Sequence, residues 1–429
     1  MNSFSKSMAV FSFVSVIMFV FASFINPFSD DKLFELVSKS NLFNQQFPQE
    51  KVYLHLDRPS YWTNDTIWFK AYLKDSPIKD CNLHVELVNA NGAIISRKLY
   101  WAQGGLAYGD IGLTDALTSG VYQIRAYTDW MRNFDNHWYF KEDLIVWNLK
   151  DTQSDEKLIQ LRKREVDFQF LPEGGTFVAG VKNRVAFKAT DKNGFGLDVS
   201  GMVSDDQGKN LFSFKSGFKG MGSFIIEPQE GRKYTAEIYV EGGVTMKVSL
   251  PEPQAGGVTM AVDSYSGDSI NIKISEKTGL LLSNGGNQYF FVAQSNNMVF
   301  INRAIQPVNG FAAFAIEKEK LPTGIVRFSL FSQNLVPLCE RLVFINHHDF
   351  VTLTIEPDKM NYLRREKVNL GVKASDRKGF PSLANLSVSV FNADNQLENE
   401  KYPNNILTHF LLCTELKGKV ESPAYYFKD

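Results

Sequence analysis

Cysteine is scarce in this sequence, with three in 429 residues. The three lie far apart along the chain, at Cys81, Cys339 and Cys413. A disulfide framework or a structural zinc site needs closer, paired spacings, so neither is expected. Histidine is also rare, and its one cluster is His347-His348-Asp349. Because neighbouring residues of a strand point to opposite faces, these two rings are not expected to share a metal ion.

The local signatures of common enzymes are missing as well. There is no Gly-x-Ser-x-Gly elbow for a serine nucleophile, and no glycine-rich phosphate loop. Lysine and arginine, 46 together, nearly balance aspartate and glutamate, 47 together, and no basic stripe stands out. Nucleic acid is therefore a poor partner. We expect a protein that is not an enzyme, holds no metal or cofactor, and takes no small-molecule substrate.

Long apolar runs are absent after the N-terminus. The single long apolar stretch, Met8 to Ile25, follows the charge of Lys6 and is followed by polar residues from Ser29. Val20-Phe21-Ala22 carries residues that signal peptidase accepts, which predicts a signal peptide over residues 1–22. An uncleaved N-terminal membrane anchor is the alternative, since the stretch could nearly span a bilayer. Both predict an exported chain.

Strand signals, by contrast, are abundant. Aromatic residues reach 13%, and bulky rings fit a pleated, half-buried surface. Apolar and polar residues alternate from Val52 to Leu56, and tight-turn signals such as Asn91-Gly92 recur along the chain. Strands separated by such turns predict β-sandwiches. Within residues 31–49 one short amphipathic helix is predicted, with a single apolar face: Leu33, Leu36 and Val37.

Internal repeats indicate that one sandwich type is used several times. Residues 187–196 and 372–381 share Lys, Ala, Asp, Gly and Phe at equivalent positions. The spacing of Asp, Tyr and an acidic residue over residues 57–65 recurs over residues 358–366. We expect these acidic residues to cap turns rather than bind calcium. Such repetition is the sequence signature of an array of similar domains.

The predicted fold class is therefore all-β, as tandem immunoglobulin-like or macroglobulin-like β-sandwiches after an N-terminal signal helix. Turn signals and composition set the boundaries of three complete domains and one partial domain. The four predicted β-sandwiches cover residues 50–150, 166–253, 257–348 and, as a partial sandwich, 350–429.

Residues 50–73, which include EKVYLHLDRP and DTIWFKAYL, resemble the opening of a macroglobulin-type domain. They are similar to the bacterial alpha-2-macroglobulin-like envelope proteins. Residues 120–134, 171–180 and 340–344 fit the same group, and the resemblance covers roughly residues 50–429. It implies macroglobulin-like sandwiches, a location in the periplasm or at the outer membrane and cell surface, and no known catalysis.

Some of these relatives continue into a plug domain like that of TonB-dependent outer-membrane receptors. Residues 416–429 resemble the region from which longer relatives continue, so the resemblance implies a shortened member linked to receptor function, or a truncated reading frame. The fourth domain would then lack its closing strands and leave an edge with which another chain could pair. Macroglobulin protease traps carry a thioester between a Cys and a Gln three residues later. Cys413 is followed at that position by Leu416, which has no acyl group, so covalent trapping is not expected.

Tryptophan is confined to the first predicted domain, at Trp62, Trp68, Trp101, Trp130, Trp138 and Trp147. Trp68 lies in a strand pattern and is expected in the core. The aromatic residues over 130–140 are too dense for one buried strand face. They either pack against the second domain or the N-terminal segment, or form a binding ridge. The aromatic ridge is defined here as the predicted partner-binding set: Trp130, Arg132, Phe134, Trp138 and Tyr139.

The leading functional hypothesis is a non-enzymatic, exported, multi-domain binding or adaptor protein of the bacterial cell envelope. Its expected partner is an envelope protein or an outer-membrane receptor. One alternative is a macroglobulin-like protease inhibitor without a thioester. A second is a glycan-binding module, in which exposed rings would stack on sugars.

Overall fold

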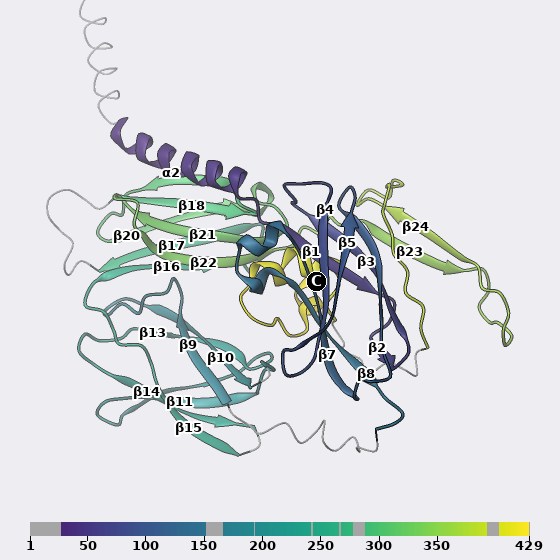
Figure 1. The fold of residues 1–429 in the computed structure, drawn as a ribbon. Helices are drawn as coiled ribbons and strands as arrows, with labels where there is room; N and C mark the ends of the chain where they lie inside the picture. Colours follow the sequence, from purple (N-terminus) through teal and green to yellow (C-terminus); the bar gives the residue numbers. More distant parts are fainter. Residues whose placement is uncertain are drawn as a thin grey trace, which may run out of the picture.

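The structure is a computed structural model of the chain. The predicted signal peptide at residues 1–22 lies outside the residues that it describes. Within the described part, no helix has the length and apolar character needed to cross a membrane. Strands dominate, and the predicted all-β class is confirmed (Figure 1). The described residues are 27–151, 166–192, 194–241, 243–265, 267–277, 288–392 and 403–428.

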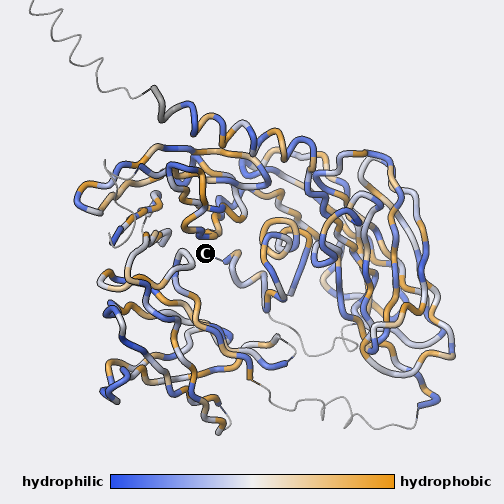
Figure 2. Tube along the Cα trace, turned by 60° about the vertical axis from the view of Figure 1, so that its left-hand side comes forward, coloured by the Kyte–Doolittle hydropathy of each residue, from blue (hydrophilic) through white to orange (hydrophobic). Residues whose placement is uncertain are grey.

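The first sandwich packs a three-stranded sheet on a five-stranded sheet, with Leu54, Ile67 and Ala71 fully buried between them. Alternation along each strand puts the apolar side chains on the inner faces, and Figure 2 shows this alternation along the trace. The three-stranded sheet runs β1 (Lys51–Leu56), β3 (Thr66–Lys74) and β6 (Leu106–Gly112). The five-stranded sheet runs β2 (Ser60–Trp62), β8 (Phe140–Trp147), β7 (Gly120–Thr128), β4 (Cys81–Val88) and β5 (Ile94–Ala102).

The second sandwich repeats the plan with a phenylalanine-rich core, in which the Phe187 ring lies 4.8 Å from that of Phe214. One sheet runs β13 (Met221–Ile226), β10 (Asn183–Asp191) and β9 (Val166–Pro172). The facing sheet runs β12 (Asn210–Lys215), β11 (Val199–Asp205), β14 (Tyr234–Val240) and β15 (Val244–Ser249).

The third sandwich carries the predicted helix on its outside. Its first sheet runs β16 (Gly257–Asp263), β17 (Ser269–Lys277) and β20 (Phe311–Glu317). Its second runs β19 (Met298–Ile305), β18 (Tyr289–Ser295), β21 (Gly324–Ser332) and β22 (Pro337–Ile345). Helix α2 (Pro27–Gln46) lies along this second sheet, where Leu33 packs on Phe290 and Val292 (Figure 1). The predicted amphipathic helix and its apolar face are confirmed.

Residues 350–429, predicted as a partial sandwich, contain one two-stranded sheet in their described part. It consists of β23 (Thr352–Pro357) and β24 (Leu370–Ser375), with no second sheet facing it. The chain then returns to the middle of the molecule, where Figure 1 marks its C-terminal end. There it forms α4 (Ile406–Leu411) and the 3₁₀-helices η5 (Cys413–Glu415) and η6 (Pro423–Phe427).

This C-terminal segment, residues 403–428, contacts all three sandwiches. The His409 ring nitrogen Nε2 lies 2.8 Å from the carbonyl oxygen of Val52 in the first sandwich. The ammonium of Lys219, in the second, pairs with Glu421 at 2.5 Å. The Phe427 ring lies 4.8 Å from that of Phe344 in the third. The segment therefore links domains that are far apart in the sequence.

Candidate functional site

The first half of the aromatic ridge packs partly on the N-terminal segment. It lies on η1 (Trp130–Asn133), which leads from β7 toward β8. The half-buried Trp130 donates its indole N–H to the carbonyl oxygen of Pro48 at 2.8 Å, and its ring meets Phe134 edge-on at 5.9 Å. Arg132 is exposed, with a guanidinium nitrogen 3.9 Å from Asp129. Packing against the N-terminal segment is thus observed for Trp130, and partner binding stays a prediction.

The second half packs on the core of its own sandwich. Trp138, at the end of η2 (Asn136–Trp138), and Tyr139 both contact that core. The Tyr139 ring stacks on Tyr127 with centroids 4.2 Å apart. Trp138 and Tyr139 also line a groove that the C-terminal segment closes from the other side. The five ridge residues therefore do not present one continuous surface.

The prediction that Trp68 lies in the core is wrong, because its side chain is 59% exposed. Its neighbours Ile67 and Phe69 fill the inner face of β3, so alternation turns Trp68 outward. Trp101 is also exposed, on the outer side of the opposite sheet. These two rings lie on different faces of the sandwich and cannot form one platform.

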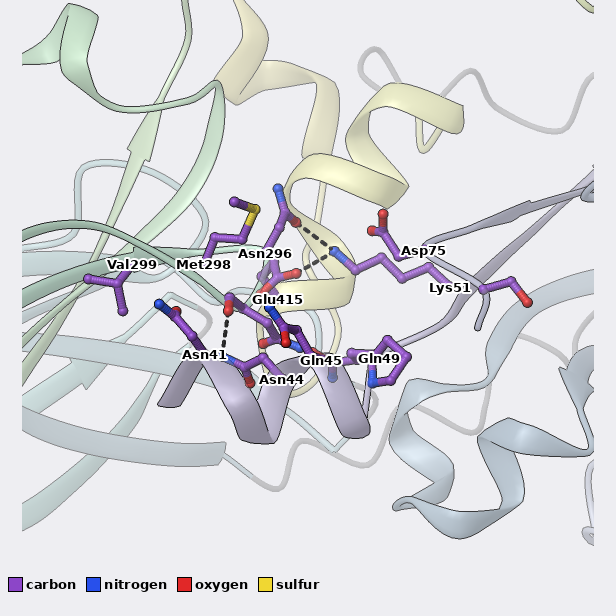
Figure 3. Close-up of a pocket in the computed structure, with 13 residues that line it drawn as sticks. Asn41, Asn44, Gln45, Gln49, Lys51, Asp75, Asn296, Met298, Val299 and Glu415 are labelled. Carbon is purple, nitrogen blue, oxygen red and sulfur yellow. Dashed lines mark hydrogen bonds and ion pairs between the residues drawn. The ribbon is translucent and has the colours of Figure 1, made fainter. Parts of the chain in front are cut away.

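A polar pocket of about 450 Å³ lies where α2, the first sandwich, the third sandwich and the C-terminal segment meet (Figure 3). Its walls are rich in side-chain amides, each of which can donate and accept hydrogen bonds. The six carboxamides that line it are Asn41, Asn44, Gln45, Gln49, Asn296 and Asn297. Residue spacing could not predict this group, because its members come from segments more than two hundred residues apart that meet only in the folded chain.

One wall of this pocket is an ion pair. Lys51 is buried, and its ammonium pairs with the Glu415 carboxylate (Figure 3). The same ammonium donates to Asn296 Oδ1 at 3.2 Å and to the carbonyl oxygen of Phe410 at 3.4 Å. These partners satisfy a charge that would otherwise be costly to bury. The pair also ties the start of β1 to the C-terminal segment.

Exposed aromatic side chains follow the same stretch of chain as the carboxamides of the pocket, although they do not line it. Phe43 and Phe47, one helical turn apart at the end of α2, are both exposed, with ring centroids 5.1 Å apart. Pro48, which follows them, lines the pocket and accepts the hydrogen bond from Trp130. A polar hollow thus lies beside exposed aromatic rings and adjoins the first half of the ridge. We call this surface the α2 face: the pocket with Phe43, Phe47, Pro48, Trp130 and Phe134.

The groove beside Trp138 has a volume of about 570 Å³ and holds two unusual titratable groups. Burial raises the pKa of Glu142 to about 7, with a further rise from nearby Asp143. Burial lowers the pKa of His409 to about 4, so its ring is neutral near pH 7 and can donate Nε2–H to Val52. Burial thus favours the neutral form of both groups.

The environments of the three cysteines disfavour a nucleophilic role. Burial raises the pKa of Cys339 and Cys413 to about 12 and that of Cys81 to about 11, which disfavours the reactive thiolate. Across the described ranges, no three His, Cys, Asp or Glu side chains come together as metal ligands. His347 Nε2 instead lies 2.8 Å from the carbonyl oxygen of Leu321.

Neither a protein-family profile nor a curated protein matches this chain. Solved structures match its fold at low identity. Escherichia coli alpha-2-macroglobulin activated by porcine elastase is 13% identical. The match covers 76% of this chain and 33% of the macroglobulin chain, with a TM-score of 0.26. Salmonella alpha-2-macroglobulin reacted with methylamine is 12% identical. The match covers 76% of this chain and 25% of the Salmonella chain, with a TM-score of 0.21. The BSP domain of a biofilm-associated protein is 12% identical. The match covers 74% of this chain and 69% of the BSP chain, with a TM-score of 0.24.

This chain spans a quarter to a third of the length of the bacterial macroglobulins that it matches. These likenesses concern the fold alone.

Proposed function

We propose that this chain is a non-enzymatic, multi-domain binding protein of the bacterial cell envelope, and that it docks a partner protein on the α2 face. The observation that carries the proposal is the carboxamide-lined pocket beside the exposed rings of Phe43 and Phe47. Side-chain amides can pair with both the N–H and the C=O groups of a bound polypeptide segment. Exposed aromatic rings provide the apolar anchors that dominate protein interfaces.

The linkage between domains supports the same role. The C-terminal segment contacts each of the three sandwiches, and the pocket lies at one of these junctions. A site on such a junction is held by packing on several sides, so a bound partner need not order it. Preorganisation of this kind lowers the entropic cost of binding. The proposed location is the periplasm or the outer membrane, and an outer-membrane receptor is the partner class that the sequence resemblance implies.

The test is capture from envelope extract by the purified chain, followed by reconstitution with the captured protein alone. Phe43→Ser/Phe47→Ser should lose the partner, because both rings are exposed and contribute to the proposed interface. The matched control is Leu211→Ser/Ile225→Ser, which removes two exposed apolar side chains from the second sandwich. Equal capture by both variants, with unchanged circular dichroism, would reject the α2 face as the docking site.

The two alternative functions predict different outcomes in the same material. A protease inhibitor without a thioester should retain a protease after one limited cleavage. A glycan-binding module should show tryptophan quenching on addition of polysaccharide. The exposed tryptophans that would report it are Trp68 on one sheet and Trp62 and Trp101 on the other. No arrangement of side chains described above favours either alternative over protein docking.

A further inference from the structure

The hairpin β23–β24 is a copy of the hairpin β9–β10 of the second sandwich, shifted by a constant 185 residues, as from Phe168 to Leu353. The cross-strand partners on the apolar face correspond one to one. In the second sandwich these pairs are Phe168 with Ala189, Phe170 with Phe187, and Pro172 with Val185. In the later hairpin they are Leu353 with Ala374, Ile355 with Val372, and Pro357 with Leu370.

The turn that leaves each hairpin is also the same. Asp191 accepts the backbone N–H of Phe195 at 2.9 Å, and Asp376 accepts that of Phe380 at 2.9 Å. Gly194 and Gly379 take the same left-handed conformation, at φ of 81° and 83°. After each turn, the chain makes one further backbone hydrogen bond to the preceding strand, from Leu197 N–H to Ala189 O in the first case and from Ser382 N–H to Ala374 O in the second. The two segments are one structural unit used twice.

What differs is the covering of the apolar face. In the second sandwich the chain continues into β11 of the facing sheet, and Val185 and Phe187 are buried. At the equivalent positions of the later hairpin, Leu370 is 48% and Val372 is 42% exposed. On the other strand, Ile355 is 61% exposed. No sheet faces them in the part of the chain that the structure describes.

The segment equivalent to β11 is held elsewhere. After the turn, the chain crosses to the outer side of β1 and β3 (Figure 1). The Ser387 hydroxyl lies 2.6 Å from His55 Nδ1 and 2.8 Å from the Tyr72 hydroxyl. The Lys70 ammonium donates to Asn385 Oδ1 and to the Leu386 carbonyl oxygen, both at 2.9 Å. These bonds keep the segment on the first sandwich, away from the hairpin.

We propose that a second copy of this chain covers the hairpin face, which we define as Val351, Leu353, Ile355, Val368, Leu370 and Val372. All six are aliphatic and exposed. The six residues carry no charge, so two copies of the face can meet about a two-fold axis without like-charge repulsion. Two such hairpins packed face to face would recreate the two-layer arrangement of the second sandwich.

The available area suits a weak dimer. Six aliphatic side chains, each about half exposed, present on the order of 500 Å² per copy, which is comparable to the largest apolar patch of a typical monomer, a kind of patch that is often functional. Two copies would bury roughly 1,000 Å², at the lower limit for a specific interface. The hairpin face is separate from the α2 face, so this inference goes beyond the proposed function and can fail independently of it.

The test is sedimentation equilibrium of the full exported chain over roughly 1 to 100 µM, a range suited to a small interface. The wild type should change from monomer to dimer within this range. Ile355→Asp/Val372→Asp should stay monomeric, because each dimer would bury four carboxylates. The matched control, Thr352→Asp/Thr354→Asp, places two charges on the opposite face of β23 and should dimerise like the wild type. A monomeric wild type, or a dimer that survives Ile355→Asp/Val372→Asp, would overturn the proposal.

Cross-linking keeps the proposal testable if the charged variant loses the hairpin itself. Ile355→Cys should form a disulfide-linked dimer on mild oxidation, since a two-fold axis through the hairpin face brings equivalent residues together. Thr354→Cys, on the outward face, carries the same native cysteines and should not cross-link. Equal cross-linking of the two variants, or none in either, would reject the hairpin face as the dimer contact.

Discussion

Glu142 and His409 line one groove, and ionisation of either one destabilises the fold, but the two ionise in opposite directions of pH. The folded state raises the pKa of Glu142 from 4.5 to about 7, so its contribution is fully present below pH 4.5 and is lost as the pH rises through about 7. It lowers the pKa of His409 from 6.5 to about 4, so that contribution is present above pH 6.5 and is lost as the pH falls through about 4. Between pH 4.5 and 6.5 the two therefore oppose each other.

Glu142→Gln separates the two effects, because glutamine keeps the shape and cannot ionise. The difference in melting temperature between the variant and the wild type should grow in favour of the variant as the pH rises from about 4.5 to 8. Thermal unfolding followed by circular dichroism at several pH values measures this difference. A difference that stays constant with pH would show that Glu142 is not desolvated in the folded chain.

Trp68 and Ile67 are sequence neighbours with opposite environments, and they test the corrected assignment of Trp68. Ile67 is fully buried, so Ile67→Ala should reduce the free energy of unfolding by about 2 to 5 kcal/mol. Trp68→Ala, which removes a larger but mostly exposed side chain, should change it by less than about 1 kcal/mol. Urea denaturation of both variants makes the comparison. A larger loss of unfolding free energy for Trp68→Ala than for Ile67→Ala would show that the Trp68 side chain is buried in the core.

At the scale of elements, the periodicity of apolar residues predicted those features that depend on nearby residues of the chain. The apolar face of α2, the alternating strands and the repeat of residues 187–196 in 372–381 all follow from residue spacing within about ten residues. Periodicity could not predict which surface α2 covers, since Phe290 and Val292 lie some 250 residues away in the sequence. It also could not predict the carboxamide pocket, whose residues share no pattern. The predicted inward placement of Trp68 is wrong because Ile67 and Phe69 take the inner face of β3, and alternation then turns Trp68 outward.

Neighbouring residues of α2 provide a test of its docking. Leu33 is buried against the third sandwich, whereas Phe34 is 74% exposed. Leu33→Asp should release the helix, because it would bury an unpaired carboxylate. Hydrogen exchange should then quicken over residues 31–46 and at the β18 residues that the helix covers. Phe34→Asp is the control and should leave exchange unchanged. Equal protection in both variants would show that the helix does not depend on this contact.

At the scale of the whole molecule, the C-terminal segment connects domains that their own cores would allow to fold separately. Each sandwich has its own buried cluster, and the first and second are joined along the chain only through residues outside the described ranges. The contacts of residues 403–428 are therefore one means by which unfolding of one domain can affect another, beside direct contacts such as that of Arg341 with Glu173 between the third and second sandwiches. The Lys51–Glu415 pair is the most buried of the ionic links in this segment.

Removing one member of this pair should weaken that coupling. Glu415→Ala would leave the Lys51 ammonium buried without its counter-charge, at a cost of about 3 to 5 kcal/mol. Because the cost falls on the junction and not on any core, the first sandwich should unfold earlier in urea while the second and third keep their midpoints. Lys51→Met/Glu415→Leu removes both charges, keeps similar volumes, and should restore most of the loss. Tryptophan fluorescence reports the first sandwich alone, since all six tryptophans lie there. An unchanged fluorescence midpoint in Glu415→Ala would mean that the junction does not stabilise the first sandwich.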